Sequence, residues 1–440
     1  MRIDPNETLG ERIRRLRLEK GMSQNDLADG FVTISMISQI ENERRIPSVE
    51  LAQHIARKLQ VPLSDLMRHE VDQMETAWKH QVSKVYILTK QPAEAEQLLK
   101  DLLGLKDLSH AQQIEMTVDL AESLYLQNRY SEILELLIPL AEELESSTFD
   151  DVRTLARIHY TIGNAYYQKQ NLTDANFHYR RADSLSLRFP LFDELAARIS
   201  YNTGITLQLQ GHHQSSAYYL ERAYDFFSKT ENMYETAAVI FAQGITYKNL
   251  REYELAHDTM SRALTMFEML NLTHNSYIVK RTMASTLTVQ ENPKLAIEQL
   301  QDCIKPFEEQ KNYNFLVIVL SEIAAIEISL GNLQSASKYL VDADITIQRQ
   351  GLQSNREAGE YFKTVALYYL ESELFSDAVE NALISAEIFD KIGSVADHVD
   401  ALQIACDAYH ESGQDSQAYS IQRRCIELLK QLTGRSERIL

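Results

Sequence analysis

The chain has 440 residues, 44% of them hydrophobic, with only 14 glycines, 8 prolines and 3 scattered cysteines. This length predicts several domains or a repeat array, the few turn residues favour long helices, and the lack of an apolar run of about 20 residues excludes a membrane-spanning helix. Residues 1–70 hold 11 basic and 11 acidic residues, so the whole net charge of −19 falls on residues 71–440, and this acidic part cannot itself lie along a DNA backbone.

Residues 8–66 carry the capping and turn signals of five short helices. A Ser, Thr or Pro stands where each helix would begin, and an acidic side chain three residues after the first two completes a capping box. The predicted helix starts are Thr8, Ser23, Thr33 or Ser35, Ser48 and Pro62. Gly21 and Asp29-Gly30 supply the turns that follow the first two helices, and Ile37 and Ile40 are spaced to anchor the third helix in a core.

Residues 8–69 resemble the Xre, Cro and lambda-repressor type of helix-turn-helix domain. The resemblance rests on the segments Ser23–Ala28 and Ile37–Asn42 and on Pro47. One departure is a turn between the second and third helices that is a residue shorter than usual. Another is Glu43, which takes the place of a family glycine, so a residue with a Cβ atom is expected in a left-handed conformation at a cost of up to about 1 kcal/mol.

The resemblance implies that the third helix lies in the major groove of DNA. The residues expected to face bases are Thr33, Ile34, Ser35, Met36, Ser38 and Gln39. Gln39 can pair with adenine, and Ile34 or Met36 can meet a thymine methyl group. The residues expected to hold phosphates are Gln24, Asn42, Arg44 and Arg45. The alternative is a domain retained only for contacts with proteins.

Residues 72–430 repeat a pattern with a period near 40 residues. A small residue recurs at Ser83, Ala121, Gly163, Gly204, Gly244, Ala284, Ala324, Ala366 and Cys406. Further small residues follow 12 and 19 positions later, among them Cys303 and Cys425, so these cysteines are predicted to be core spacers rather than redox switches. Small residues at such offsets let antiparallel helices approach closely. The pattern therefore predicts an all-α fold in which about nine tetratricopeptide-like helix pairs stack into a right-handed solenoid, with residues 431–440 as a tail.

The first helix of each pair is expected to line the concave face of the solenoid. Positions −6, −3, +1 and +4 from the small residue share one helix stripe. The residues predicted on this stripe or at its edge are Arg157, Tyr160, Asn164, Tyr167, Arg198, Tyr201, Asn202, Gln208, Phe241, Lys248 and Arg281. Their amide, guanidinium and aromatic groups suit an extended peptide, whose backbone an Asn side chain can pair with at both N–H and C=O. The alternative is that they are ordinary surface residues.

A helix-turn-helix domain followed by such repeats resembles the peptide-pheromone receptors of Gram-positive bacteria, the group of PlcR, NprR, the Rgg regulators and the Rap phosphatases. Length and repeat number are most similar to the NprR-like branch. The resemblance implies a cytoplasmic homodimer that binds operator DNA and a short signalling peptide. The alternative function is a scaffold that binds and inhibits a response regulator or another signalling protein.

No catalytic motif stands out in the sequence. It lacks a phosphate-binding glycine loop, a His-Glu-x-x-His motif and a nucleophile elbow, so no enzyme activity is expected. His212-His213 has no further ligands at suitable spacing, so neither a metal nor a cofactor is predicted. The N-terminus lacks the apolar segment of a signal peptide, and three cysteines are too few for a disulfide framework, which favours the cytoplasm.

Overall fold

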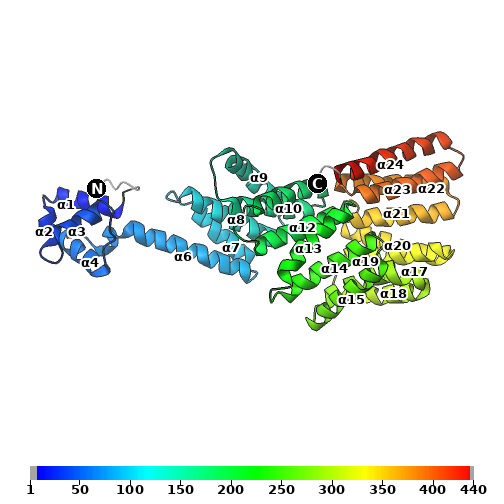
Figure 1. The fold of residues 1–440 in the computed structure, drawn as a ribbon, viewed down its shortest axis with the longest axis horizontal. Helices are drawn as coiled ribbons and strands as arrows, with labels where there is room; N and C mark the ends of the chain where they lie inside the picture. Colours follow the sequence, from blue (N-terminus) through cyan, green and yellow to red (C-terminus); the bar gives the residue numbers. More distant parts are fainter. Residues whose placement is uncertain (1–6, 437–440) are drawn as a thin grey trace. The chain divides into compact units, whose positions relative to one another are not determined.

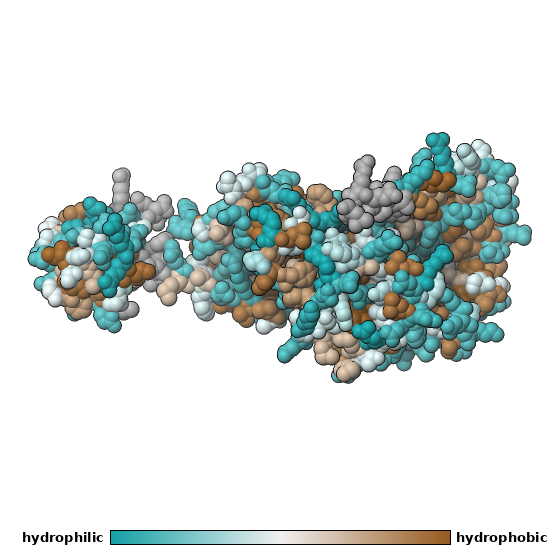
Figure 2. All heavy atoms as spheres, viewed as in Figure 1, coloured by the Kyte–Doolittle hydropathy of each residue, from teal (hydrophilic) through white to brown (hydrophobic). Residues whose placement is uncertain are grey.

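The computed structural model describes residues 7–436, apart from the side chains at positions 49, 64, 68–72 and 431–436, and its regular elements are all helices (Figure 1). The predicted all-α fold is confirmed. The chain divides into two compact units, Met1–Leu137 and Ile138–Leu440. No helix of the described residues is long and apolar enough to cross a membrane. Figure 2 shows apolar side chains interspersed with polar ones over the visible face of both units.

The first unit begins with the five predicted short helices. They are α1 (Leu9–Glu19), α2 (Gln24–Ala28), α3 (Ile34–Glu41), α4 (Val49–Lys58) and α5 (Leu63–Leu66). Their N-caps are Thr8, Ser23, Thr33, Ser48 and Pro62, with a complete capping box at each of the first two. Thr33 rather than Ser35 therefore begins α3. Gly21, Asp29 and Gly30 all have positive φ, as the predicted turns require.

α1 packs closely against α3, and α3 ends at a left-handed residue. Ile13, Ile37 and Ile55 are fully buried between the helices. A Cβ atom on Gly10 would lie 2.5 Å from the carbonyl oxygen of Ile40, so only glycine permits this close crossing. Glu43 has φ of +61°, as predicted, and closes α3 in a Schellman motif in which the next residue donates its N–H to the carbonyl of Gln39.

The rest of the first unit is formed by longer helices. They are α6 (Arg68–Leu88), α7 (Pro92–Leu103) and α8 (His110–Leu126), followed by α9 (Tyr130–Ser146), which contains Pro139 and runs across the division between the units. The predicted boundary between residues 71 and 72 falls inside α6, which is one continuous helix. The domain boundary at this position stays a prediction.

The second unit continues the helical repeat. Its helices are α10 (Val152–Gln168), α11 (Leu172–Ser186), α12 (Glu194–Leu209), α13 (His213–Phe227), α14 (Met233–Asn249), α15 (Tyr253–Met269), α16 (Thr273–Met283), the π-helical turn η1 (Ala284–Thr288), α17 (Val289–Glu291), α18 (Pro293–Glu309), α19 (Tyr313–Ser329), α20 (Leu333–Gln350), α21 (Arg356–Glu371), α22 (Phe375–Ile392), α23 (Val395–Glu411) and α24 (Asp415–Ser436). Successive helices pack in pairs, such as α10 with α11 and α21 with α22. α24 includes residues 431–436 of the predicted tail, and residues 437–440 lie outside the described part.

The small residues do what the repeat pattern predicted. A Cβ atom added to Gly163, Gly204 or Gly244 would come within 2.6–2.8 Å of a side chain on the second helix of its pair. Cys303 and Cys425 are almost fully buried and unpaired, which confirms them as core spacers. Close helix contact therefore selects the small residues.

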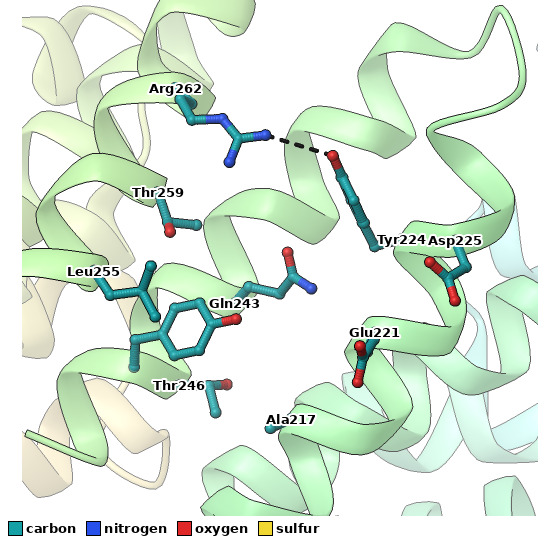
Figure 3. Close-up of a pocket in the computed structure, with 10 residues that line it drawn as sticks. Ala217, Glu221, Tyr224, Asp225, Gln243, Thr246, Leu255, Thr259 and Arg262 are labelled. Carbon is teal, nitrogen blue, oxygen red and sulfur yellow. Dashed lines mark hydrogen bonds between the residues drawn. The ribbon is translucent and has the colours of Figure 1, made fainter. Parts of the chain in front are cut away.

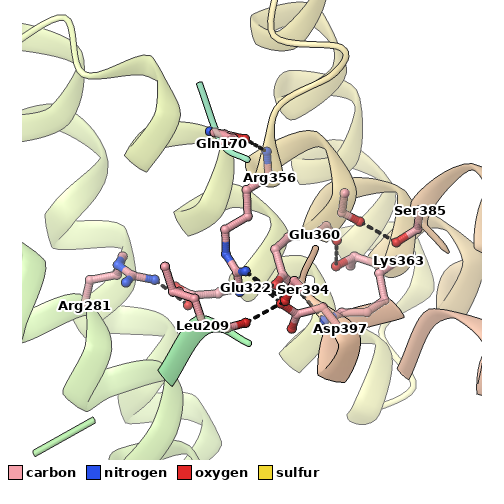
Figure 4. Close-up of polar contacts among 12 residues, drawn as sticks. Gln170, Leu209, Arg281, Glu322, Arg356, Glu360, Lys363, Ser385, Ser394 and Asp397 are labelled. Atoms are coloured by element: carbon pink, nitrogen blue, oxygen red, sulfur yellow. Dashed lines mark hydrogen bonds and ion pairs between the residues drawn. The ribbon is translucent and has the colours of Figure 1, made fainter. Parts of the chain in front are cut away.

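Two features of the second unit depart from a regular repeat. The π-helical turn η1 follows α16 directly, so the helix changes there from α-helical to the wider π-helical hydrogen bonding. The array also closes on itself: the side-chain oxygen of Gln170 accepts the N–H of Arg356 at 2.5 Å, and the Ser394 hydroxyl donates to the carbonyl of Leu209 at 2.7 Å (Figure 4). Contacts between residues 185 and 186 positions apart thus join the first repeats of this unit to its last ones.

Candidate functional sites

The outer face of α3 holds most of the residues predicted to face bases. Thr33, Ile34, Ser35 and Gln39 are exposed, and Ile34 keeps 50% of its surface accessible. Ser38 is half-buried, and Met36 packs against the domain core. The Thr33 hydroxyl accepts the N–H of Met36 as the helix cap. Ile34, Ser35 and Gln39 therefore have the freest side chains on this helix, and base contact by any of the six stays a prediction.

The four predicted phosphate-binding residues fall into two kinds. Arg44 and Arg45 are exposed and form no ion pair with any residue that the structure describes. The Gln24 amide instead donates to Glu41 at 2.8 Å, and the Asn42 amide donates to the carbonyl of Ser38 at 2.7 Å. The two arginines are available to a DNA backbone as they stand, whereas Gln24 and Asn42 are already oriented by the protein.

A buried ion pair, which the sequence did not reveal, holds α1 to α3. The Arg17 guanidinium donates to both carboxylate oxygens of Glu41, at 2.6 and 2.9 Å, and to the carbonyl of Met22 at 2.8 Å. Hydrogen bonding to Glu41 raises the pKa of Arg17. Because Gln24 bonds the same carboxylate, Glu41 joins the start of α2 to the other two helices. Arg17 is therefore structural and is not available to phosphate.

The second unit contains a cavity of about 590 Å³, and the first helices of successive pairs form its wall. Its lining comes from α12 and the start of α13, from α14, α16 with η1, α19, α21 and α23. Ile245, Ser321 and Leu367 occupy the predicted stripe positions +1, −3 and +1 of their repeats. The expectation that first helices face inward holds for this cavity, which is of a size that encloses small ligands.

The cavity lies further along the chain than the predicted peptide-binding stripe. Three of the predicted residues, Gln208, Lys248 and Arg281, line it. The other eight do not: Arg157, Tyr160, Asn164, Tyr167, Arg198, Tyr201, Asn202 and Phe241. The prediction placed the stripe on the repeats around residues 163–284, whereas the residues that line the cavity fall between 208 and 400.

Several of the predicted residues bond one another instead. The Asn164 side-chain oxygen accepts the Tyr179 hydroxyl and the Asn202 amide, each at 2.8 Å. Arg198 is paired with Glu194 and Glu235 at 2.9 and 2.7 Å. A peptide would have to compete with these contacts, which join α10, α11 and α12 through Asn164 and join α12 to α14 through Arg198.

Charged side chains line the cavity in nearly balanced pairs. Arg281 bonds Glu322 at 2.6 Å, Arg356 bonds Asp397 at 2.7 Å, and Lys363 bonds Glu360 at 2.7 Å (Figure 4). Burial raises the pKa of Glu322 and of Asp400, and it lowers the pKa of Lys248. Lys248 and Asp400 have no ion pair with any described residue, although Lys248 interacts with the charges of Glu322 and Asp397 and Asp400 with that of Lys363.

Part of this lining could have been found from the sequence. Glu360 and Lys363 stand at positions −6 and −3 from Ala366, and Asp400 stands at −6 from Cys406, so the same spacing rule predicts them if it is continued past Arg281. Arg356 and Asp397 lie outside the rule, near the starts of α21 and α23, where the array closes. No repeat signal marks them.

Two further clusters were not predicted. A hollow of about 340 Å³ lies between α13, α14 and α15, where Arg262 donates to the Tyr224 hydroxyl at 3.4 Å above Gln243 (Figure 3). In the first unit, ligand atoms of His80, Glu115 and Asp119 lie within 4.8 Å of one another. The ammonium group of Lys84 contacts that cluster, at 2.5 Å from Glu115 and 3.7 Å from Asp119, and so already supplies a positive charge there.

Comparisons with known proteins support both the helix-turn-helix domain and the repeat array. Residues 13–66 match the helix-turn-helix family. The chain is 20% identical to the transcriptional activator NprA of Geobacillus stearothermophilus over 412 residues, 90% of this chain and 97% of the relative. The solved structure of a Rap protein complexed with competence and sporulation factor has a TM-score of 0.64 at 16% identity, covering 82% of this chain and 99% of that one. The apo quorum sensor NprR of B. thuringiensis has a TM-score of 0.56 at 13% identity, covering 81% and 99%. The predicted resemblance to this group is confirmed, and this chain shares the fold of the Rap and NprR structures.

Proposed function

We propose that this chain, which joins a helix-turn-helix domain to the repeat fold of the NprR and Rap group, is a cytoplasmic transcription regulator controlled by a short signalling peptide. The observation that carries the proposal is the cavity of about 590 Å³, which charged, polar and apolar side chains from consecutive repeats line. The similarity of the whole chain to a transcriptional activator over 412 residues supports a role in binding DNA. Peptide binding inside the closed array would alter how the array presents the DNA-binding domain.

The proposal is tested by screening unblocked synthetic peptides of five to eight residues against the full-length protein. A peptide present at about 100 times its Kd is expected to stabilise the protein by about 2.7 kcal/mol, which thermal melting detects. The same peptide should change the affinity for operator DNA selected from a random pool. If no peptide changes either quantity, while a response regulator is captured in stoichiometric amount, the scaffold alternative replaces this function.

Arg44 and Arg45 are expected to contribute to DNA affinity without sequence preference. Replacing both with alanine should weaken binding to selected and random duplexes by a similar factor and reduce the salt-dependence slope by about 2, because two phosphate contacts are lost. Gln39→Ala should instead relax the base preference at one position, costing about 1–3 kcal/mol for the preferred sequence only. Electrophoretic mobility shifts at several salt concentrations measure both. An unchanged slope in the double variant would contradict the assignment.

Homodimer formation is part of the proposal, and an apolar stripe on α6 supports it. Met74, Trp78, Val85 and Leu88 are 74%, 65%, 54% and 80% exposed, and their spacing is that of the core positions of a coiled coil. Burial of a Trp side chain contributes roughly 2–3 kcal/mol, so Trp78→Glu should shift the protein toward monomer by about 30-fold or more in Kd. Light scattering after gel filtration measures the mass. Lys79→Glu on the neighbouring face is the control, and a Trp78 variant that dimerises normally would rule the stripe out as the interface.

A further inference from the structure

Three buried polar atoms in one corner of the cavity have no hydrogen-bond partner among the described residues. They are Nε of Arg281, the hydroxyl of Ser285 and the second carboxylate oxygen of Glu322, and the Ser285 hydroxyl lies close enough to Glu322 to favour its charged form. An unsatisfied buried polar atom costs about 1–3 kcal/mol, so three such atoms together indicate a site where a bound molecule supplies the missing hydrogen-bond partners. All three residues line the cavity.

The local backbone and packing hold this corner in place. Arg281 and Ser285 are one turn apart, with Ser285 on the π-helical turn η1, an irregularity that is common at functional sites. The Arg281 guanidinium lies 5.7 Å from the Phe315 ring centre, bonds Glu322 at 2.6 Å and donates to the Thr282 hydroxyl at 3.1 Å. These contacts fix the guanidinium while leaving Nε without an acceptor.

Lys248 adds a positive charge to the same corner. Its ammonium group interacts with the charges of Glu322 and Arg281, yet it forms no ion pair with a described residue. Burial lowers its pKa, and the negative charges of Glu322, Asp397 and Glu360 offset that effect only in part. An anion placed beside it would therefore recover a large interaction.

We infer that Lys248, Arg281 and Ser285 bind a carboxylate group of the signalling peptide, either its free C-terminus or an acidic side chain. A carboxylate accepts several hydrogen bonds, which matches one ammonium, one guanidinium N–H and one hydroxyl donor. The free oxygen of Glu322 can accept an N–H of the same ligand. This inference rests on the proposed function, because it specifies which peptides the cavity selects.

The experiment compares one selected peptide in three chemical forms. Full-length protein is used to select binders from a library of unblocked hexapeptides, and the best one is measured by calorimetry as the free acid, as the C-terminal amide, and with each acidic side chain changed to its amide. Neutralising the bound carboxylate should weaken binding by tenfold or more. Loss on C-terminal amidation identifies the C-terminus as the ligand group, and loss on side-chain amidation identifies that side chain.

Variants of the protein assign the effect to this corner. Lys248→Met should weaken the free acid by about tenfold and leave the neutralised peptide bound as it is by the unaltered protein, so the two losses should not multiply. Lys248→Arg should retain most of the affinity. Lys280→Met is the matched control, since Lys280 pairs with Glu268 and does not line the cavity. Thermal melting checks that each variant is folded.

The outcomes separate this inference from the function on which it rests. If every neutral form binds within twofold of the free acid, or if neutralisation costs the same factor in Lys248→Met as in the unaltered protein, the carboxylate assignment is wrong while peptide sensing stands. If the library yields no binder, both are overturned.

Discussion

Glu41→Ala is expected to destabilise the helix-turn-helix domain by about 3–5 kcal/mol, because it leaves the Arg17 guanidinium buried without its counter-ion. The Glu41 side chain is only 2% exposed, and it accepts three hydrogen bonds, two from Arg17 and one from Gln24. Its removal frees three donors at the junction of α1, α2 and α3. Since small domains have only about 5–15 kcal/mol of stability in total, a loss of this size removes a large share of it and should weaken DNA binding.

Hydrogen exchange on the full-length protein measures this effect where it arises. Amide protection in α1 and α3 should fall by roughly two to four orders of magnitude in Glu41→Ala, while protection in α19 and α21 stays unchanged. The neighbouring Glu43 gives a matched control, because it is exposed and has positive φ. Glu43→Gly should keep or increase protection, by up to about 1 kcal/mol, since glycine adopts that conformation without strain. Equal protection in Glu41→Ala and the unaltered protein would show that the ion pair is dispensable.

Local signals in the sequence were sufficient to predict the first domain. Thr8, Ser23 and Ser48 cap helices because a hydroxyl can satisfy the free N–H groups of a first turn, and this chemistry depends only on residues within four positions. The left-handed Glu43 was predictable for the same reason. The bond between Arg17 and Glu41 was not, because it joins residues 24 positions apart whose pairing depends on the packing of α1 against α3.

Periodicity predicted the repeats but not the interior that they enclose. A small residue every 40 positions reports only the contact between one helix and its immediate partners, as at Gly204 and Leu220. Closure of the array depends on contacts such as that between Leu209 and Ser394, 185 residues apart, and a repeat pattern carries no information at that distance. The stripe positions of the later repeats do include Glu360, Lys363 and Asp400, but the period does not show that these residues face the same cavity as Lys248 and Arg281.

The histidine pair in α10 and α11 is expected to make the second unit acid-sensitive. Nδ1 of His159 and Nδ1 of His178 are 3.0 Å apart, and Nε2 of His159 is 3.2 Å from Glu145. If His159 donates its Nε2 proton to Glu145, its Nδ1 can accept the Nδ1 proton of His178, so the contact between the two rings is satisfied while both are neutral. A second proton on the pair would place two N–H groups against each other. Tyr166 stacks on His178 and Phe177 contacts it edge-on, while Arg181 pairs with Glu145.

The direction of the pH effect follows from the pKa of His178. Burial, and then the charge of His159, lower it from 6.5 to about 4. Because this folded-state pKa lies below the unfolded one, the unfolded chain binds more protons between pH 6.5 and 4, and stability is lost as the pH falls through that range. The loss should reach about 2 kcal/mol near pH 4, less than the full shift implies because the ring is partly exposed to solvent.

Replacing His178 with asparagine should remove much of this loss, because an amide can donate to Nδ1 of His159 without titrating. Urea unfolding followed by circular dichroism at pH 7 and pH 4.5 measures the stability change between the two conditions for each protein. His410→Asn is the control, since His410 is 73% exposed beside Asp415 and should leave the acid sensitivity as it is. If His178→Asn loses as much stability between the two pH values as the unaltered protein, the pair is not the source of the acid sensitivity, and the carboxylates of the cavity become the groups to examine next.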